Sequence, residues 1–188
     1  MTDITNITAE QAVEVLLLHI GEDPTREGLL DTPKRVAKAL REMTCGYELD
    51  AKDVLATTFD EQSDEMVVLR RIGFASMCEH HMLPFTGTAT VGYVPDKRVV
   101  GLSKMARLVE MYARRLQVQE RMTRQIAAAM WEHLSPLGVG VVVHGHHSCM
   151  GVRGVKQPQG VMTTSAMVGI FKHSDATRNE FLRLANGE

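Results

Sequence analysis

The chain has 188 residues, an ordinary globular composition (44% hydrophobic, 23% charged) and a formal net charge of -2. This length suits a single domain with a helical extension, and the balanced charge argues against a nucleic-acid binder. No apolar run approaches the roughly 18 residues of a membrane span, and the start lacks signal-peptide features. We therefore expect a cytoplasmic protein with no nucleic acid or membrane as partner. Its three cysteines favour metal ligation or burial over disulfides in such a compartment.

The first fifty residues carry the signals of two helices. A capping box, Thr8-x-x-Gln11, opens a helix that Gly21 closes. Thr32, which precedes a proline, starts the second helix. We therefore predict an N-terminal helical region over residues 1–60.

The rest of the chain alternates between β-rich and helical patterns. Residues 66–77 and 86–94 are β-rich, and two helices with apolar stripes follow, opening near Ser103 and Arg121. The remaining elements are two strands and a short helix, over residues 139–150, 162–171 and 177–184. This order predicts an α+β domain over residues 61–188, with an antiparallel β-β-α-α-β-β sheet and its helices on one face.

The densest group of reactive side chains is Cys78-Glu79-His80-His81. The Cys-x-x-His spacing lets one turn hold Cys78 and His81 on a single zinc ion. His80 lies between them and would point elsewhere, free for proton transfer. Because an isolated Cys-x-x-His often arises by chance, an inert buried cysteine is the alternative.

A second group, His144 to Cys149, follows the apolar strand that begins near Val139. Strand alternation places His147 and Cys149 on one face, and His144 and His146 on the other. This arrangement makes Cys149 a third ligand and His147 a neighbouring acid or base. Two cysteines and one histidine leave the fourth tetrahedral position open, as in catalytic zinc sites.

Basic residues gather at the start of the first long helix. Ser103 is a candidate cap, and Lys104 and Arg107 lie three residues apart on one helical face. A helix N-terminus with two cations favours phosphate, and Arg153 would add another cation from the second group. The alternative is a solvated basic helix face.

Glu120 lies at the break between the two helices. Its two carboxylate oxygens match the paired ring N–H and amino donors of guanine, which adenine lacks. The alternative is an acid that interacts favourably with the dipole at a helix N-terminus.

Several segments together resemble the type I GTP cyclohydrolase family, over roughly residues 10 to 185. They are Cys78-Glu79-His80-His81, Gly101-Leu102-Ser103-Lys104, Gln117-Val118-Gln119-Glu120-Arg121, His147-Ser148-Cys149 with Arg153-Gly154, and Thr163-Thr164-Ser165. The resemblance implies a tunnelling fold, in which subunits pool their sheets into a barrel. It also implies a homodecamer of two stacked pentamers, with active sites at subunit junctions.

The implied reaction is the hydrolytic opening of the imidazole ring of GTP, with release of formate and rearrangement to 7,8-dihydroneopterin triphosphate. This reaction is the first step of pterin and tetrahydrofolate biosynthesis. By resemblance, the family's roles fall on these residues: Cys78, His81 and Cys149 as Zn²⁺ ligands; His147 and His80 as acid–base groups; Ser103 in the catalytic pocket; Gln119 and Glu120 on the guanine edge; Lys104, Arg107 and Arg153 on the triphosphate.

Two other functions compete with this one. A tunnelling-fold deazaguanine nitrile reductase would need a nucleophilic cysteine and a nicotinamide cofactor, whereas both candidate cysteines here lie beside histidines at ligand spacing. A non-catalytic zinc- or nucleotide-binding module would bind GTP without releasing formate, and it would not require the two additional histidines or Glu120.

Overall fold

The computed structural model describes residues 6–61 and 63–187, and the chain divides into two compact units at Thr44/Cys45. The first unit pairs helix α1 (Ala9–His19) with helix α2 (Thr32–Thr44). The predicted capping box is confirmed: the Thr8 hydroxyl accepts from the Gln11 N–H, and the Gln11 side chain accepts from the Thr8 N–H. Gly21, just beyond α1, has a φ of +87°, a conformation that suits glycine at a helix end.

The second unit contains the sheets and the remaining helices. The helices are η2 (Cys45–Glu48), α3 (Ala51–Leu55), α4 (Leu102–Ala113), α5 (Gln119–Leu134), α6 (Ser148–Gly151), α7 (Ile170–His173) and α8 (Asp175–Asn186). The strands are β1 (Thr58–Asp60), β2 (Val67–Cys78), β3 (Pro84–Val94), β4 (Arg98–Val100), β5 (Leu116–Gln117), β6 (Gly138–His147) and β7 (Met162–Gly169). Within the described ranges, no helix is long and apolar enough to cross a membrane.

The main sheet has the strand order β5-β2-β3-β6-β7, and β1 pairs with β4 in a separate two-stranded sheet. The predicted succession β-β-α-α-β-β is confirmed as β2, β3, α4, α5, β6 and β7. All pairings of these four strands are antiparallel, whereas the short strand β5 pairs in parallel with β2.

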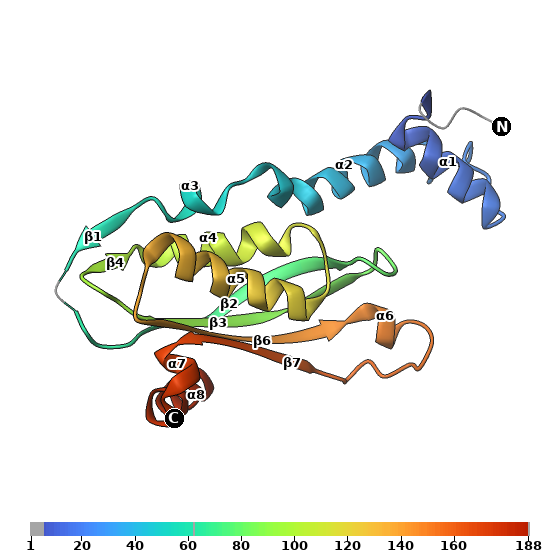
Figure 1. Ribbon diagram of the computed structural model, residues 1–188. Helices are drawn as coiled ribbons and strands as arrows, with labels where there is room; N and C mark the ends of the chain where they lie inside the picture. The colour runs from blue at the N-terminus through green and yellow to red at the C-terminus, as the bar shows by residue number, and fades with distance from the viewer. Residues whose placement is uncertain (1–5, 62, 188) are drawn as a thin grey trace. The chain divides into compact units, whose positions relative to one another are not determined.

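Helices α4 and α5 lie together over one face of the main sheet (Figure 1). On β6, Val139, Val141 and Val143 face this helical layer and belong to the core that also contains Leu108 of α4 and Ile126 of α5. Alternate residues of a strand lie on one face, and residues three or four apart lie on one face of a helix. The apolar face of β6 therefore packs against the apolar faces of α4 and α5.

The C-terminal helices add a smaller contact on the opposite face of the sheet (Figure 1). Phe171 and Phe181 are fully buried there and pack against Val142, which points away from α4 and α5. Gly140 permits this approach, since a Cβ atom on it would lie 2.7 Å from the Phe171 ring and 2.8 Å from the Phe181 ring.

Three predicted boundaries are wrong in detail. The strand expected to reach residue 150 ends at His147, because the chain turns into α6 at Ser148. The helical spacing of apolar residues after Ser103 extends to Leu116 and predicts a helix that includes it, but α4 ends at Ala113 and Leu116 joins the sheet through β5. Ser103 is not the cap of α4: the helix already begins at Leu102, and its N-cap, Gly101, makes no side-chain capping bond.

Candidate active site

The first half of the site is a tight turn at the end of β2. The Cys78 N–H donates to the Leu83 carbonyl at 2.9 Å, and the Met82 N–H donates to the Cys78 carbonyl at 2.8 Å. Met82 closes the turn with a φ of +53°. The turn brings Cys78 Sγ to 3.8 Å from His81 Nδ1, so the two candidate ligands meet on one side of it.

The second half comes from the end of β6. Strands β3 and β6 pair so that His147 lies opposite Phe85. The chain then enters α6 at Ser148, whose hydroxyl donates to the Pro84 carbonyl at the start of β3. This hydrogen bond holds the start of α6 beside β3, and it thereby positions the next residue, Cys149.

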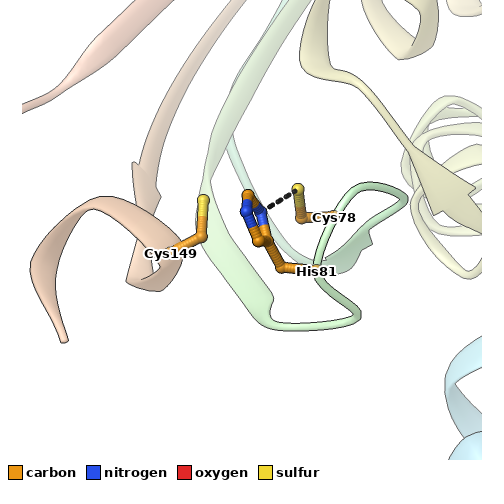
Figure 2. A group of neighbouring side chains, drawn as sticks. All are labelled: Cys78, His81 and Cys149. Carbon is orange, nitrogen blue, oxygen red and sulfur yellow. Dashed lines mark hydrogen bonds between the residues drawn. The ribbon is translucent and has the colours of Figure 1, made fainter. Parts of the chain in front are cut away.

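Together, Cys78, His81 and Cys149 form a candidate metal site. One ligand atom from each residue lies within 4.8 Å of the others. Figure 2 shows the three side chains gathered in one place, with His81 and Cys78 on the turn and Cys149 on the other segment. Burial, and then the nearby Cys78 thiol, raise the pKa of Cys149, so two thiolates here would need a neighbouring positive charge. Thiolate and imidazole donors suit soft and borderline metal ions, and these three residues can therefore hold a metal.

A cavity of about 200 Å³ adjoins this metal site. It is lined by the three candidate ligands together with His80, His147, Glu120 and the segment before Glu120. His80 Nδ1 lies 3.9 Å from Cys78 Sγ, and the His80 ring meets the His81 ring edge-on. The fold thus collects both predicted acid–base histidines around one small space.

His147 is the more enclosed of these two histidines. Its ring stacks on Phe85 with 4.5 Å between ring centroids and an interplanar angle of 8°. Its Nε2 lies 3.0 Å from Gln119 Oε1. Burial lowers the pKa of His147, and the Glu120 charge opposes this shift.

Gln119 and Glu120 open helix α5 but occupy different surroundings. The Gln119 side chain is 0% exposed, whereas Glu120 is exposed at the cavity. A carboxylate in the first turn of a helix, open to a cavity, is free to accept hydrogen bonds from a ligand. Glu120 therefore lies where it can contact a ligand in the cavity, whereas the Gln119 side chain is directed into the protein.

An ion pair that the sequence did not reveal joins the Cys78–His81 turn to helix α5. Arg121 Nη2 donates to Glu79 Oε1 at 3.0 Å, and Arg121 Nη1 donates to Glu79 Oε2 at 2.5 Å. The hydrogen bond and charge of Arg121 lower the pKa of Glu79. No local pattern predicts the pair, because its members are 42 residues apart.

The predicted phosphate contacts lie in two places. Arg153 is at the metal site, with Nη1 3.2 Å from His81 Nε2. Lys104 and Arg107 instead line a separate cavity of about 430 Å³, between α4 and the η2–α3 segment. The C-terminal end of α4 is the end near Cys78, because Leu116, just beyond the helix, pairs with Met77. Lys104 lies nine residues before the last residue of α4, which is about 14 Å along the helix from the end near Cys78.

Ser103 shares the first turn of α4 with Lys104 and is exposed there. The single chain therefore brings together the candidate metal ligands, His80, His147, Glu120 and Arg153. It does not bring Ser103, Lys104 or Arg107 to the same cavity.

Three side chains that could hold a metal, beside two histidines and an exposed carboxylate at one end of a β-β-α-α-β-β sheet, define an enzyme of the tunnelling fold. A family model described as GTP cyclohydrolase I matches residues 9–186. The chain belongs to the GTP cyclohydrolase I family, a family of hydrolases.

Relatives from distant organisms support this assignment. A protein of Gloeobacter violaceus named GTP cyclohydrolase 1 is 59% identical over 174 residues, which cover 92% of this chain and 81% of that protein. A protein of the same name from Wolinella succinogenes is 52% identical over 94% of this chain and 95% of its own length. One from Dictyostelium discoideum is 52% identical over 94% of this chain and 77% of its own length.

Proposed function

We propose that this protein opens the imidazole ring of GTP by hydrolysis, releases the C8 atom as formate and rearranges the remainder to 7,8-dihydroneopterin triphosphate. Two waters are consumed when the ring opens and formate leaves, and one is lost when the new ring closes. The observation that carries the proposal is the single cavity lined by Cys78, His81, Cys149, His147 and Glu120, in a chain of this family.

We propose zinc as the metal held by Cys78, His81 and Cys149. Tetrahedral zinc with ordinary bond lengths places a sulfur and a nitrogen ligand about 3.6 Å apart. The distance of 3.8 Å between Cys78 Sγ and His81 Nδ1 is close to that value. When bound, zinc supplies Lewis-acid activation of water near neutral pH.

The residues around the metal site have separate tasks in this proposal. Glu120 accepts hydrogen bonds from the ring N–H and the amino group of guanine, which selects this base over adenine. His147 delivers a proton to the guanine N7, which makes C8 electrophilic toward water. His80 serves the later proton transfers of the ribose rearrangement, for which an imidazole is suited near neutral pH.

We propose that the triphosphate is bound by Arg153 of one chain and by Ser103, Lys104 and Arg107 of a neighbouring chain. The separation of these basic residues within one chain supports a site assembled at subunit junctions. Strands β5 and β7, at the two edges of the sheet, offer backbone groups for pairing with other subunits. A homodecamer of two pentamers, with residues 61–188 as the catalytic domain and residues 1–60 as a helical region, completes this proposal.

The test is to incubate zinc-analysed protein with GTP and to follow formate and the pterin chromophore together. Formate and pterin in equal amounts are the expected result. Cys149→Ser should lose both zinc and turnover, whereas His147→Ala should keep zinc and lose ring opening. Tight GTP binding without either product, at full zinc occupancy, would instead indicate a nucleotide-binding module.

A further inference from the structure

The Gln119 side chain is held by a set of hydrogen bonds that fixes the direction of its amide. Its Nε2 lies 3.0 Å from the Val143 carbonyl, 3.0 Å from the Met162 carbonyl and 3.1 Å from Thr164 Oγ1. These three acceptors use both hydrogens of the amide nitrogen, one of which must be shared. Since the side chain is 0% exposed, none of these bonds competes with water.

A ring of hydroxyl groups reinforces the same direction. Thr123 Oγ1 donates to the Gln119 backbone carbonyl at 2.7 Å, so its hydrogen is already used. Thr164 Oγ1, 2.7 Å from Thr123 Oγ1, must then donate to Thr123 and accept from Gln119 Nε2. A reversed amide would place Oε1 against two carbonyl oxygens and leave it without a donor.

The amide direction decides which nitrogen of His147 carries hydrogen. Gln119 Oε1 lies 3.0 Å from His147 Nε2, and an amide oxygen can only accept. His147 Nε2 must therefore be the donor, and Nδ1 is the ring nitrogen that Gln119 leaves available for the proposed proton delivery to guanine. Phe85, stacked on the ring with 4.5 Å between centroids and itself 1% exposed, holds the ring plane.

We propose that Gln119 is a positioning residue that acts through His147 and makes no contact with the substrate. It holds the hydrogen on Nε2, so that the proton delivered to guanine leaves from Nδ1. In that step the Nδ1–H bond breaks, its electron pair stays on Nδ1, and an N7–H bond forms on the base. The resulting neutral imidazole keeps the hydrogen that Gln119 accepts. This inference rests on the proposed function and replaces the guanine-edge role that the family resemblance implies for Gln119.

Kinetics and binding separate the two roles of Gln119. The variant Gln119→Met keeps the length of the side chain and removes both its acceptor and its donors. We expect kcat to fall by at least about tenfold while KM for GTP changes by less than about threefold, because only the transition state loses an interaction. If Gln119 instead contacted guanine, the Gln119→Met variant would bind GTP more weakly and its KM for GTP would rise.

The decisive measurement uses His147→Ala as background, in which GTP is bound and not consumed. Adding Gln119→Met there should leave the Kd for GTP within about threefold, since the group on which Gln119 acts is already missing. A rise of tenfold or more in that background would overturn the inference. Wild-type formate release is measured in parallel: if it is absent, the proposed function has failed, whereas a binding effect with active wild type refutes only the role of Gln119.

A second variant disturbs the contact between Gln119 and His147 without changing either residue. A Cβ atom on Gly145 would lie 2.2 Å from Gln119 Oε1, so Gly145→Ala must push this oxygen away. We expect it to lower kcat without weakening GTP binding and without loss of zinc. Gly73→Ala is the matched control in β2, because a Cβ atom there has nothing within 4 Å, and its kcat should match wild type. Equal kcat in Gly145→Ala and Gly73→Ala would count against the inference.

Discussion

Glu79 and Arg121 form a bidentate ion pair that connects the Cys78–His81 turn to the first turn of helix α5. The Glu79 N–H also donates to the Gln117 carbonyl at 3.0 Å, so the turn is held by its backbone and by a side chain. Since the turn carries two candidate metal ligands and α5 carries Glu120, the pair sets the distance between the metal and the proposed guanine contact.

Removal of either charge should therefore loosen the metal site. We expect Glu79→Gln and Arg121→Gln each to weaken zinc binding by about tenfold, the lower range for residues that support metal ligands. The double variant should lose little more than either single one, because both act through the same contact. Zinc affinity is measured by competition with a chromogenic chelator. Glu42→Gln, which removes the exposed Lys38–Glu42 pair of α2, is the control and should leave zinc affinity unchanged.

The parts of the site that could be predicted from the sequence are those encoded by long regular patterns. The alternating valines of β6 place His147 on the helix-covered face, and the observed burial of Val139, Val141 and Val143 agrees with that parity. The same pattern predicts Cys149 on this strand, whereas the residue lies in α6 and still reaches Cys78 and His81. A strand pattern cannot indicate where the strand stops when the following residues are polar.

The contacts that were missed depend on strand register or on distant segments. Phe85 stacks on His147 only because β3 and β6 pair in one particular register, which neither strand specifies alone. The short elements η2, α3, β1, β4 and β5 were also missed, since two to five residues contain too little periodicity to predict them. The burial of Gln119 depends on β6, β7 and α5 together.

Tyr93 gives the native state a measurable dependence on alkaline pH. Its hydroxyl oxygen accepts from the Val100 N–H at 2.9 Å, and burial raises the pKa of Tyr93. Above about pH 10 the unfolded chain releases this proton while the native state retains it, so the free energy of unfolding falls as pH rises. Tyr93→Phe should be less stable than wild type by about 1 kcal/mol at neutral pH, through loss of the acceptor.

The difference in free energy of unfolding between wild type and Tyr93→Phe should then decrease between about pH 9 and pH 11, because only the wild type has this titrating group. Urea unfolding at a series of pH values measures it. Burial also raises the pKa of Tyr112, but that residue is present in both proteins and cancels in the difference. Curves that stay parallel across this range would mean that Tyr93 ionises equally in both states.

The contact of α8 with the sheet depends on glycine at position 140. A Cβ atom there would lie 2.7 Å from the Phe171 ring and 2.8 Å from the Phe181 ring, and both rings are 0% exposed. Gly140→Ala should therefore lower the free energy of unfolding by about 1–3 kcal/mol, the usual cost of overpacking. Adding Phe181→Leu should cost less in this variant than in wild type, because the smaller side chain relieves the clash. If the two substitutions lower the free energy of unfolding additively, a clash with the Phe181 ring is not the reason that position 140 requires glycine.

The separation of Arg107 from the metal site predicts the behaviour of mixed subunits. Cys149→Ser and Arg107→Ala should each have little activity alone. If the substrate lies between Cys149 of one chain and Arg107 of another, a co-assembled equal mixture has both intact residues in about a quarter of its sites. Formate release should therefore recover to about a quarter of the wild-type rate after joint unfolding and reassembly. A mixture no more active than its components, despite verified co-assembly, would place both residues in the same chain's site and remove the argument for a junctional one.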